Sequence, residues 1–170
     1  MSVSPSSPVP GWWQRSWPLV VLGVLSVTMW IGRVRNIVGD DGLDGFGRTF
    51  RLAMAVSFVV LGAALLAACW IGRQNRNWRE VAQRAPDGWR VGTGVPEWGR
   101  RVAVLLVGLT VVVWVVQGVG IGIDPNHDAS FKVVHTFLAV GSLVVAGTAA
   151  LGLRRSWPVA RPTRAQTIST

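Results

Sequence analysis

Several side chains that carry chemistry are scarce in this chain. It has one cysteine, Cys69, so it can form neither an internal disulfide nor a thiolate metal cluster. Its two histidines, His127 and His135, both belong to the second half of the chain, whereas a haem held between two helices needs a histidine on each. The G-x-S-x-G, H-E-x-x-H, P-loop and dinucleotide-binding motifs are also missing. We therefore expect no cofactor and no catalytic residues, and no named enzyme class is indicated.

Acidic residues are few as well, with eight Asp and Glu against seventeen Lys and Arg, which gives a formal net charge of +9. An excess of this size can indicate a surface that binds nucleic acid. Here, however, the basic residues lie mostly in the segments that separate long apolar runs. The charge is better explained as a signal of membrane topology, and we do not expect nucleic-acid binding.

Long apolar runs dominate the rest of the sequence. Half of the 170 residues are hydrophobic and the mean hydropathy is +0.40, which is rare among soluble domains. Four runs reach the roughly 20 residues that a helix needs to cross the hydrocarbon of a bilayer. Their apolarity is continuous rather than alternating, which excludes a β-barrel. The sequence predicts an all-α integral membrane protein with four transmembrane helices, over residues 18–39, 50–71, 102–123 and 131–153.

The distribution of basic residues predicts how these helices are oriented. Cytoplasmic segments of membrane proteins carry an excess of Lys and Arg. Twelve of the seventeen lie before the first run, between the second and third, or after the fourth, and five lie in or beside the two short connections. We therefore expect both termini in the cytoplasm. Sixteen of the basic residues are Arg, as GC-rich codons would produce, so we expect the plasma membrane of a bacterium.

The same pattern predicts the domain organisation. Residues 1–11 and 158–170 are rich in Pro, Ser and Thr, and we expect disordered cytoplasmic tails there. Residues 12–157 form the transmembrane domain. Its cytoplasmic connection, 73–101, carries seven Arg and three Trp. We expect this connection to lie against anionic lipid, with a short surface helix in its first half.

The two halves of the chain resemble each other. Trp30 and Trp114 lie 84 residues apart, and the same ungapped offset aligns further polar pairs. These pairs are Asp40 with Asp124, Asp44 with Asp128, Arg48 with Lys132, and Ser26 with Thr110. Since each half would begin in the cytoplasm, we expect two tandem helical hairpins that are parallel repeats about an axis along the membrane normal.

The acids of the two short connections have two interpretations. Asp44 and Asp128 precede the second helix of each hairpin, where a carboxylate can accept hydrogen bonds from free backbone N–H groups. Alternatively, the acids belong to a charged outer cluster between the hairpins, where they pair with arginines inside the membrane. This outer charged cluster would comprise Arg33, Arg35, Asp40, Asp44, Gln117, Asp124 and Asp128. For the two arginines there is an alternative to such pairing, which is that Arg33 and Arg35 simply extend to the lipid headgroups.

Oxygen ligands at alternate positions in the second connection suggest a metal site. Hard cations such as calcium bind several such oxygens. The candidate ligands are Asp124, Asn126, His127 and Asp128. The rest of a calcium-binding loop is missing, because Ala129 replaces the turn glycine and His135 stands where a bidentate Glu is needed. The histidines would alternatively serve as zinc ligands or as a proton relay.

Three functional classes remain open. The short chain without catalytic motifs favours a structural or accessory subunit of a larger membrane assembly. Its helices would pack against other subunits, or against a second copy, through small residues. These small residues are Ala55, Gly62, Ala63, Gly118, Gly120, Gly122, Gly141, Ala146 and Gly147. The second class is a small homo-oligomeric transporter or channel whose mouth is the outer charged cluster. The third is an enzyme or cofactor carrier at the outer leaflet.

Overall fold

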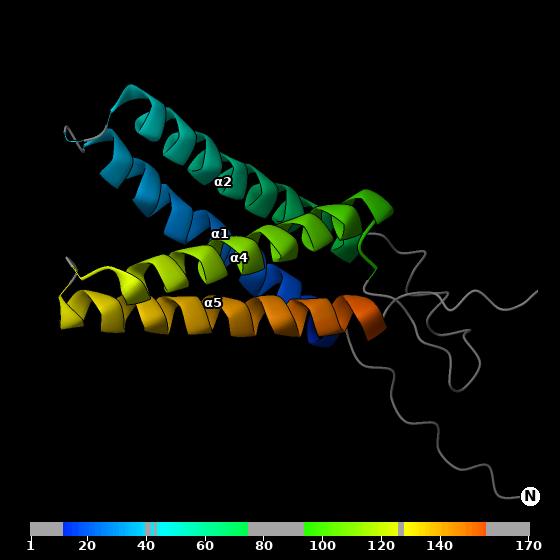
Figure 1. Ribbon diagram of the computed structural model, residues 1–170. Helices are drawn as coiled ribbons and strands as arrows, with labels where there is room; N and C mark the ends of the chain where they lie inside the picture. The colour runs from blue at the N-terminus through cyan, green and yellow to red at the C-terminus, as the bar shows by residue number, and fades with distance from the viewer. Residues whose placement is uncertain (1–11, 40–41, 43, 75–93, 126–127, 156–170) are drawn as a thin grey trace, which may run out of the picture.

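The computed structural model describes residues 12–39, 42, 44–74, 94–125 and 128–155. Within these ranges the chain forms four long α-helices and no strand. They are α1 (Trp12–Val38), α2 (Gly45–Gln74), α4 (Glu97–Ile123) and α5 (Ala129–Arg155). α1 and α2 form one hairpin, and α4 and α5 form a second (Figure 1). The predicted all-helical class is confirmed.

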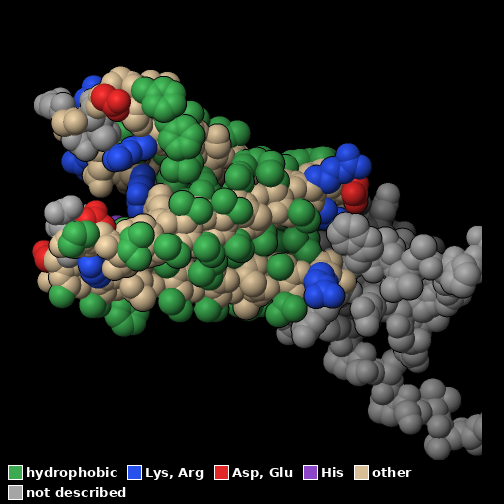
Figure 2. All heavy atoms as spheres, in the orientation of Figure 1, with side chains coloured by type: hydrophobic (Ala, Val, Ile, Leu, Met, Phe, Trp, Pro, Cys, Tyr) green, Lys and Arg blue, Asp and Glu red, His purple; other side chains and the backbone are tan. Residues whose placement is uncertain are grey.

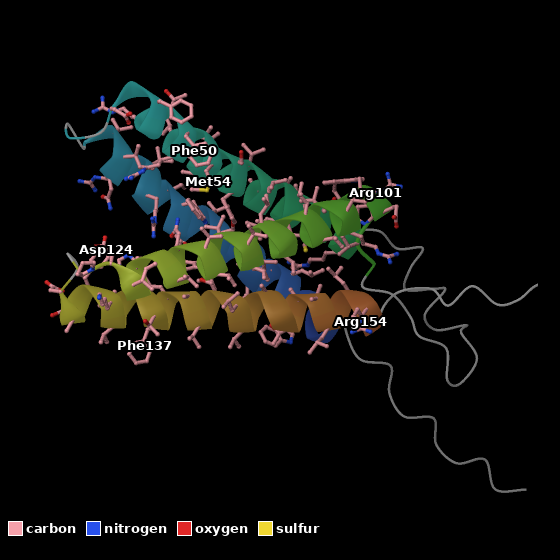
Figure 3. The ribbon with its side chains drawn as sticks, in the orientation of Figure 1. Phe50, Met54, Arg101, Asp124, Phe137 and Arg154 are labelled. Atoms are coloured by element: carbon pink, nitrogen blue, oxygen red, sulfur yellow. The ribbon has the colours of Figure 1, made fainter. Side chains whose placement is uncertain are left out.

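Each of these four helices is long and apolar enough to cross a membrane. At most 33% of the most apolar window of any helix is buried inside the protein. Most of the apolar side chains therefore point outward, and Figure 2 shows them spread along the helices. Phe137, for example, is 75% exposed and points away from the bundle (Figure 3). This surface fits a multi-pass membrane protein.

The helices extend beyond the predicted apolar runs. α1 begins at Trp12 and α4 at Glu97, in each case earlier than the hydropathy indicates. Hydropathy marks the part of a helix that lies in hydrocarbon, whereas the backbone hydrogen bonds continue into the polar end turns. The connection predicted at 73–101 is shortened at both ends as a result. Its centre, where a surface helix is predicted, and both predicted tails lie outside the described residues.

α1 and α2 pack closely because glycine lies at their crossing. A Cβ atom added at Gly62 would lie 3.0 Å from the backbone oxygen of Gly23 and 3.0 Å from Cβ of Ser26. The buried hydroxyl of Ser26 donates a hydrogen bond of 3.0 Å to the carbonyl oxygen of Phe58. The ring of Phe58 stacks on Trp30, with centroids 4.3 Å apart. Small residues and an interhelical hydrogen bond thus join the two helices.

The two hairpins meet along α2 with α4 and along α1 with α5. At one end the contact is tight, because Gly99 of α4 lies against Ala68 of α2 and Gly72 lies against the backbone of Gly94. Toward the opposite end, which carries the two short connections, the hairpins diverge (Figure 1). We call this opposite end the loop end. The end at which α1 begins and α5 finishes is the terminal end.

Candidate functional site

A polar contact joins the two hairpins near the loop end. Nη2 of Arg33 in α1 donates a hydrogen bond of 3.3 Å to Oε1 of Gln117 in α4. Both residues are half-buried, and the guanidinium also lies over the ring of Trp30, 5.6 Å from its centroid. Arg33 and Gln117 both belong to the predicted outer charged cluster, and the structure brings these two members together.

Basic side chains occupy inward-facing positions on α2 and α5 at the same end. Arg48 and Lys132 each precede a buried alanine, Ala55 and Ala139, by two helical turns. Residues at this spacing share one face of a helix, and both basic residues are half-buried. Nζ of Lys132 also donates a hydrogen bond of 3.4 Å to the carbonyl oxygen of Gly122, near the end of α4. The face that forms the core deeper in the bundle is therefore basic at the loop end.

Arg51 and His135 lie one turn further along the same faces. The positive charges of Arg51 and Arg33 repel each other. Arg51 is therefore a second arginine of α2 that lies near the contact between Arg33 and Gln117. His135 Nδ1 lies 3.0 Å from the carbonyl oxygen of Phe131 in its own helix. Arg51 is not among the site residues predicted from the sequence, although it aligns with His135 at the offset of 84 residues.

A space-filling view shows Lys and Arg side chains gathered in the hollow between the two hairpins at the loop end (Figure 2). We call the inward-facing cationic residues the loop-end basic layer. Its members are Arg33, Arg48, Arg51 and Lys132.

Asp44 and Asp128 act as helix caps. Oδ1 of Asp44 accepts a hydrogen bond of 2.8 Å from the backbone N–H of Gly47. Oδ1 of Asp128 accepts one of 2.6 Å from the N–H of Phe131. Each carboxylate therefore satisfies a free donor in the first turn of α2 or α5. The capping interpretation of these two acids is confirmed.

The other members of the predicted outer charged cluster are more dispersed. Arg35 is exposed and points to a different side of α1 from Arg33. Asp124 is half-buried at the loop end of α4 (Figure 3). Its backbone N–H donates to the carbonyl oxygen of Gly120. Asp40 lies outside the described residues. Pairing of the arginines with these acids stays a prediction.

The candidate metal site is described only in part. Asp124 and Asp128 have positions in the structure, whereas Asn126 and His127 lie outside the described residues. Among the residues with described positions, no group of three or more His, Cys, Asp and Glu side chains is placed to hold a metal ion. Metal binding in this connection therefore stays a prediction.

A small cavity lies among α1, α2, α4 and α5 below the Arg33–Gln117 contact. Its volume is about 20 Å³, which is space for about one water molecule. The buried side chains of Trp30 and Trp114 and the hydroxyls of Ser26 and Thr110 contribute to its lining. A cavity of this size does not hold a solute larger than water.

The predicted small residues are packed at Ala55 and Gly62 in the first hairpin, and in the second hairpin at the buried Ala146 but not at the glycines. Gly62 is packed against α1, as described above. By contrast, Gly118 and Gly122 on α4, and Gly141 and Gly147 on α5, have no atom within 4 Å of the point where a Cβ would lie, apart from their immediate surroundings in the helix. These faces of α4 and α5 are not covered by any other described part of the chain.

Comparison with protein-family models, with curated proteins and with solved structures gave no match. The role of the protein is therefore inferred from its own residues and contacts.

Proposed function

We propose that this protein is an accessory subunit of a larger membrane assembly and that it binds a partner subunit through the outer face of α4. The observation that carries the proposal is an exposed row of small and β-branched residues, which we call the α4 stripe. It consists of Gly108, Val111, Val115, Gly118 and Gly122, and all five are exposed. No atom lies within 4 Å of a Cβ built at any of its three glycines.

The spacing of the α4 stripe suits packing against another helix. Its members alternate at intervals of three and four residues, so they lie along one side of the helix. Gly118 and Gly122 form a G-x-x-x-G pair, which lets a second backbone approach closely. The valines lose little side-chain freedom when they are packed, because their χ1 angle is already restricted in a helix.

Packing of this kind is what drives helix association in lipid. Lipid tails are as apolar as the side chains, so close van der Waals contact rather than the hydrophobic effect stabilises the pair. The crossing of α1 and α2 at Gly23 and Gly62 uses the same chemistry inside the chain. The α4 stripe offers an equivalent surface to a helix from another protein.

The two other functional classes have weaker support. The hollow at the loop end favours a small homo-oligomeric transporter or channel with a charged outer vestibule. The cavity below it, however, is about 20 Å³, which is space for about one water molecule rather than for a solute. An enzyme or cofactor carrier at the outer leaflet would centre on residues around His127, which lies outside the described part of the chain.

We also propose that the two hairpins are parallel repeats related by the offset of 84 residues. Equivalent positions behave alike, since Asp44 and Asp128 cap their helices through the same oxygen. Trp30 and Trp114 are each 5% exposed. Other pairs buried at this offset are Leu22 with Leu106, Ser26 with Thr110, Ala55 with Ala139, and Leu65 with Ala149. Such agreement is expected if each half descends from one hairpin.

We further propose that the protein lies in a bacterial plasma membrane with both termini in the cytoplasm. The support is the distribution of Lys and Arg, twelve on the terminal side and five on the loop side. Arg101 and Arg154 are part of the larger group and lie at the terminal end (Figure 3). In this orientation the segment 73–101 would face anionic lipid.

Purification tests the accessory role. The tagged full-length protein is extracted from its native membrane in a mild detergent. We expect a foreign membrane subunit in stoichiometric amount with the wild-type protein, and its loss from the double variant Gly118→Leu/Gly122→Leu. Gly120→Leu is the matched control, because this glycine is equally exposed but lies on another side of α4, and it should keep the partner.

Circular dichroism should show the same helical content for all three proteins. A wild-type protein that purifies alone, or only as a homo-oligomer, would refute the accessory role. A foreign subunit that remains bound to the double variant would refute the α4 stripe as its docking surface.

A further inference from the structure

Independently of the accessory role, we propose that the loop-end basic layer binds a phosphate group, which belongs either to a phospholipid headgroup or to a soluble phosphate. The site lies in the hollow between the two hairpins (Figure 2). Arg33 and Arg51 form its centre, and Gln117 completes it from α4.

The first step of the argument is that cations replace apolar residues on core-facing positions. Arg33 follows the buried Trp30 by one turn, and Gln117 follows the buried Trp114 in the same way. A helix that packs inside a membrane normally continues its apolar face to the end of the contact. Here α1, α2 and α5 carry basic residues on that face at the loop end, and α4 carries the amide side chain of Gln117.

The second step is that the charges in the centre of the site have the same sign. Arg51 acts on Arg33 as a like charge, and the described hydrogen-bond partner of Arg33 is the neutral side chain of Gln117. Arg33 is half-buried next to hydrocarbon and Arg51, although exposed, adds a second positive charge beside it. This arrangement is costly, and a bound anion would offset the cost. Three described acids lie at the rim. Asp44 and Asp128 cap α2 and α5 with their carboxylates, and Asp124 is half-buried at the end of α4.

The third step concerns the class of anion. An arginine guanidinium presents several N–H donors in one plane, which matches the oxygens of a phosphate better than a single-atom anion. The amide of Gln117 adds a neutral donor from the opposite hairpin. Donors that arrive from α1, α2 and α4 suit a tetrahedral group with several acceptor oxygens.

The position of the site is compatible with both sources of phosphate. Arg33 lies five residues before the end of α1, about 8 Å along the helix axis. This depth corresponds to the boundary between headgroups and acyl chains when α1 spans the bilayer. The hollow is also open at the loop end (Figure 2), so a soluble phosphate can enter it.

The experiment uses the purified full-length protein in a neutral detergent at low ionic strength. Inorganic phosphate and a short-chain phosphatidylglycerol are titrated separately by isothermal calorimetry. Saturable binding of phosphate alone assigns the site to a soluble anion, and tighter binding of the lipid assigns it to a headgroup. Absence of saturable binding in both titrations overturns the proposal.

Variants locate the binding. Arg51→Gln should weaken the affinity about tenfold or more, because it removes one charge-assisted contact to the anion. Arg33→Gln should do the same. Arg35→Gln is the matched control, since Arg35 is an exposed arginine on another side of α1, and its affinity should stay within about twofold of the wild type.

Arg51 is exposed, so Arg51→Gln leaves the Arg33–Gln117 contact in place and separates loss of the site from loss of the fold. Circular dichroism of each variant checks that the helices persist. If Arg35→Gln weakens binding as much as Arg51→Gln, the attraction is a diffuse effect of positive charge and the proposed site is refuted.

Discussion

Replacement of Gly62 by alanine would test the packing of the first hairpin directly. The added Cβ would lie 3.0 Å from three atoms of α1, which are the backbone oxygen of Gly23, Cβ of Ser26 and Cγ2 of Val27. The first two atoms are fixed to the backbone, so they cannot move away by rotation of a side chain. The two helices must therefore separate by a few tenths of an ångström.

The expected loss of stability follows from two opposing effects. Overpacking of a close contact costs about 1–3 kcal/mol. The change from glycine to alanine recovers at most about 1 kcal/mol, because alanine restricts the unfolded backbone. The separation also stretches the hydrogen bond from Ser26 to Phe58, which spans the same crossing and contributes about 0.6 kcal/mol in a membrane protein. We expect a net loss of about 1–2 kcal/mol in the free energy of unfolding.

Gly147→Ala is the matched control, because no atom lies within 4 Å of its added Cβ. It should leave the stability unchanged or raise it by up to about 1 kcal/mol. The measurement is reversible unfolding by sodium dodecyl sulfate in mixed micelles, followed by tryptophan fluorescence and circular dichroism. If Gly62→Ala is as stable as Gly147→Ala, α1 and α2 do not cross as closely as described.

Three further outcomes are expected. Asp44→Ala and Asp128→Ala should each lower the free energy of unfolding by about 1 kcal/mol, because each removes a helix cap; wild-type stability of both variants would contradict capping. A cysteine introduced at Asn126 should react with an impermeant maleimide in whole cells, whereas one at Gln83 should not, and labelling at Gln83 would reverse the proposed orientation. A peptide of residues 73–101 should bind anionic but not neutral vesicles, and more weakly at high salt, because each arginine contributes up to about 1 kcal/mol near an anionic surface; equal binding to both vesicle types would contradict the electrostatic attraction.

The features that the sequence predicted correctly are those that depend on residues close together in the chain. Each of the four apolar runs is long enough to cross a bilayer. Within lipid, its backbone N–H and C=O groups must be hydrogen-bonded to each other, so the run forms a helix whatever it packs against. The capping roles of Asp44 and Asp128 are local too, since each carboxylate bonds to an N–H three residues ahead. The exact starts of α1 and α4 were less predictable, because polar and aromatic end turns remain helical without contributing to hydropathy.

The candidate site was only partly predictable. The sequence places Arg33 and Gln117 in one outer charged cluster and predicts acids as the partners of the arginines; the structure brings Arg33 into contact with Gln117. The sequence did not predict that Arg51 belongs to this site. Its place there depends on the divergence of the hairpins, which turns positions on the packing face of α2 into the wall of a hollow.

The glycines show the division between local and tertiary information most clearly. Gly62 and Gly118 are both small residues inside long apolar helices, and the sequence predicts a packing role for each. By itself, the sequence determined that these helices form, because hydrogen bonding within a helix and the length of an apolar run are properties of one segment. Only the tertiary structure decided that Gly62 lies at a helix crossing while Gly118 faces outward, because that depends on where a second helix passes in space.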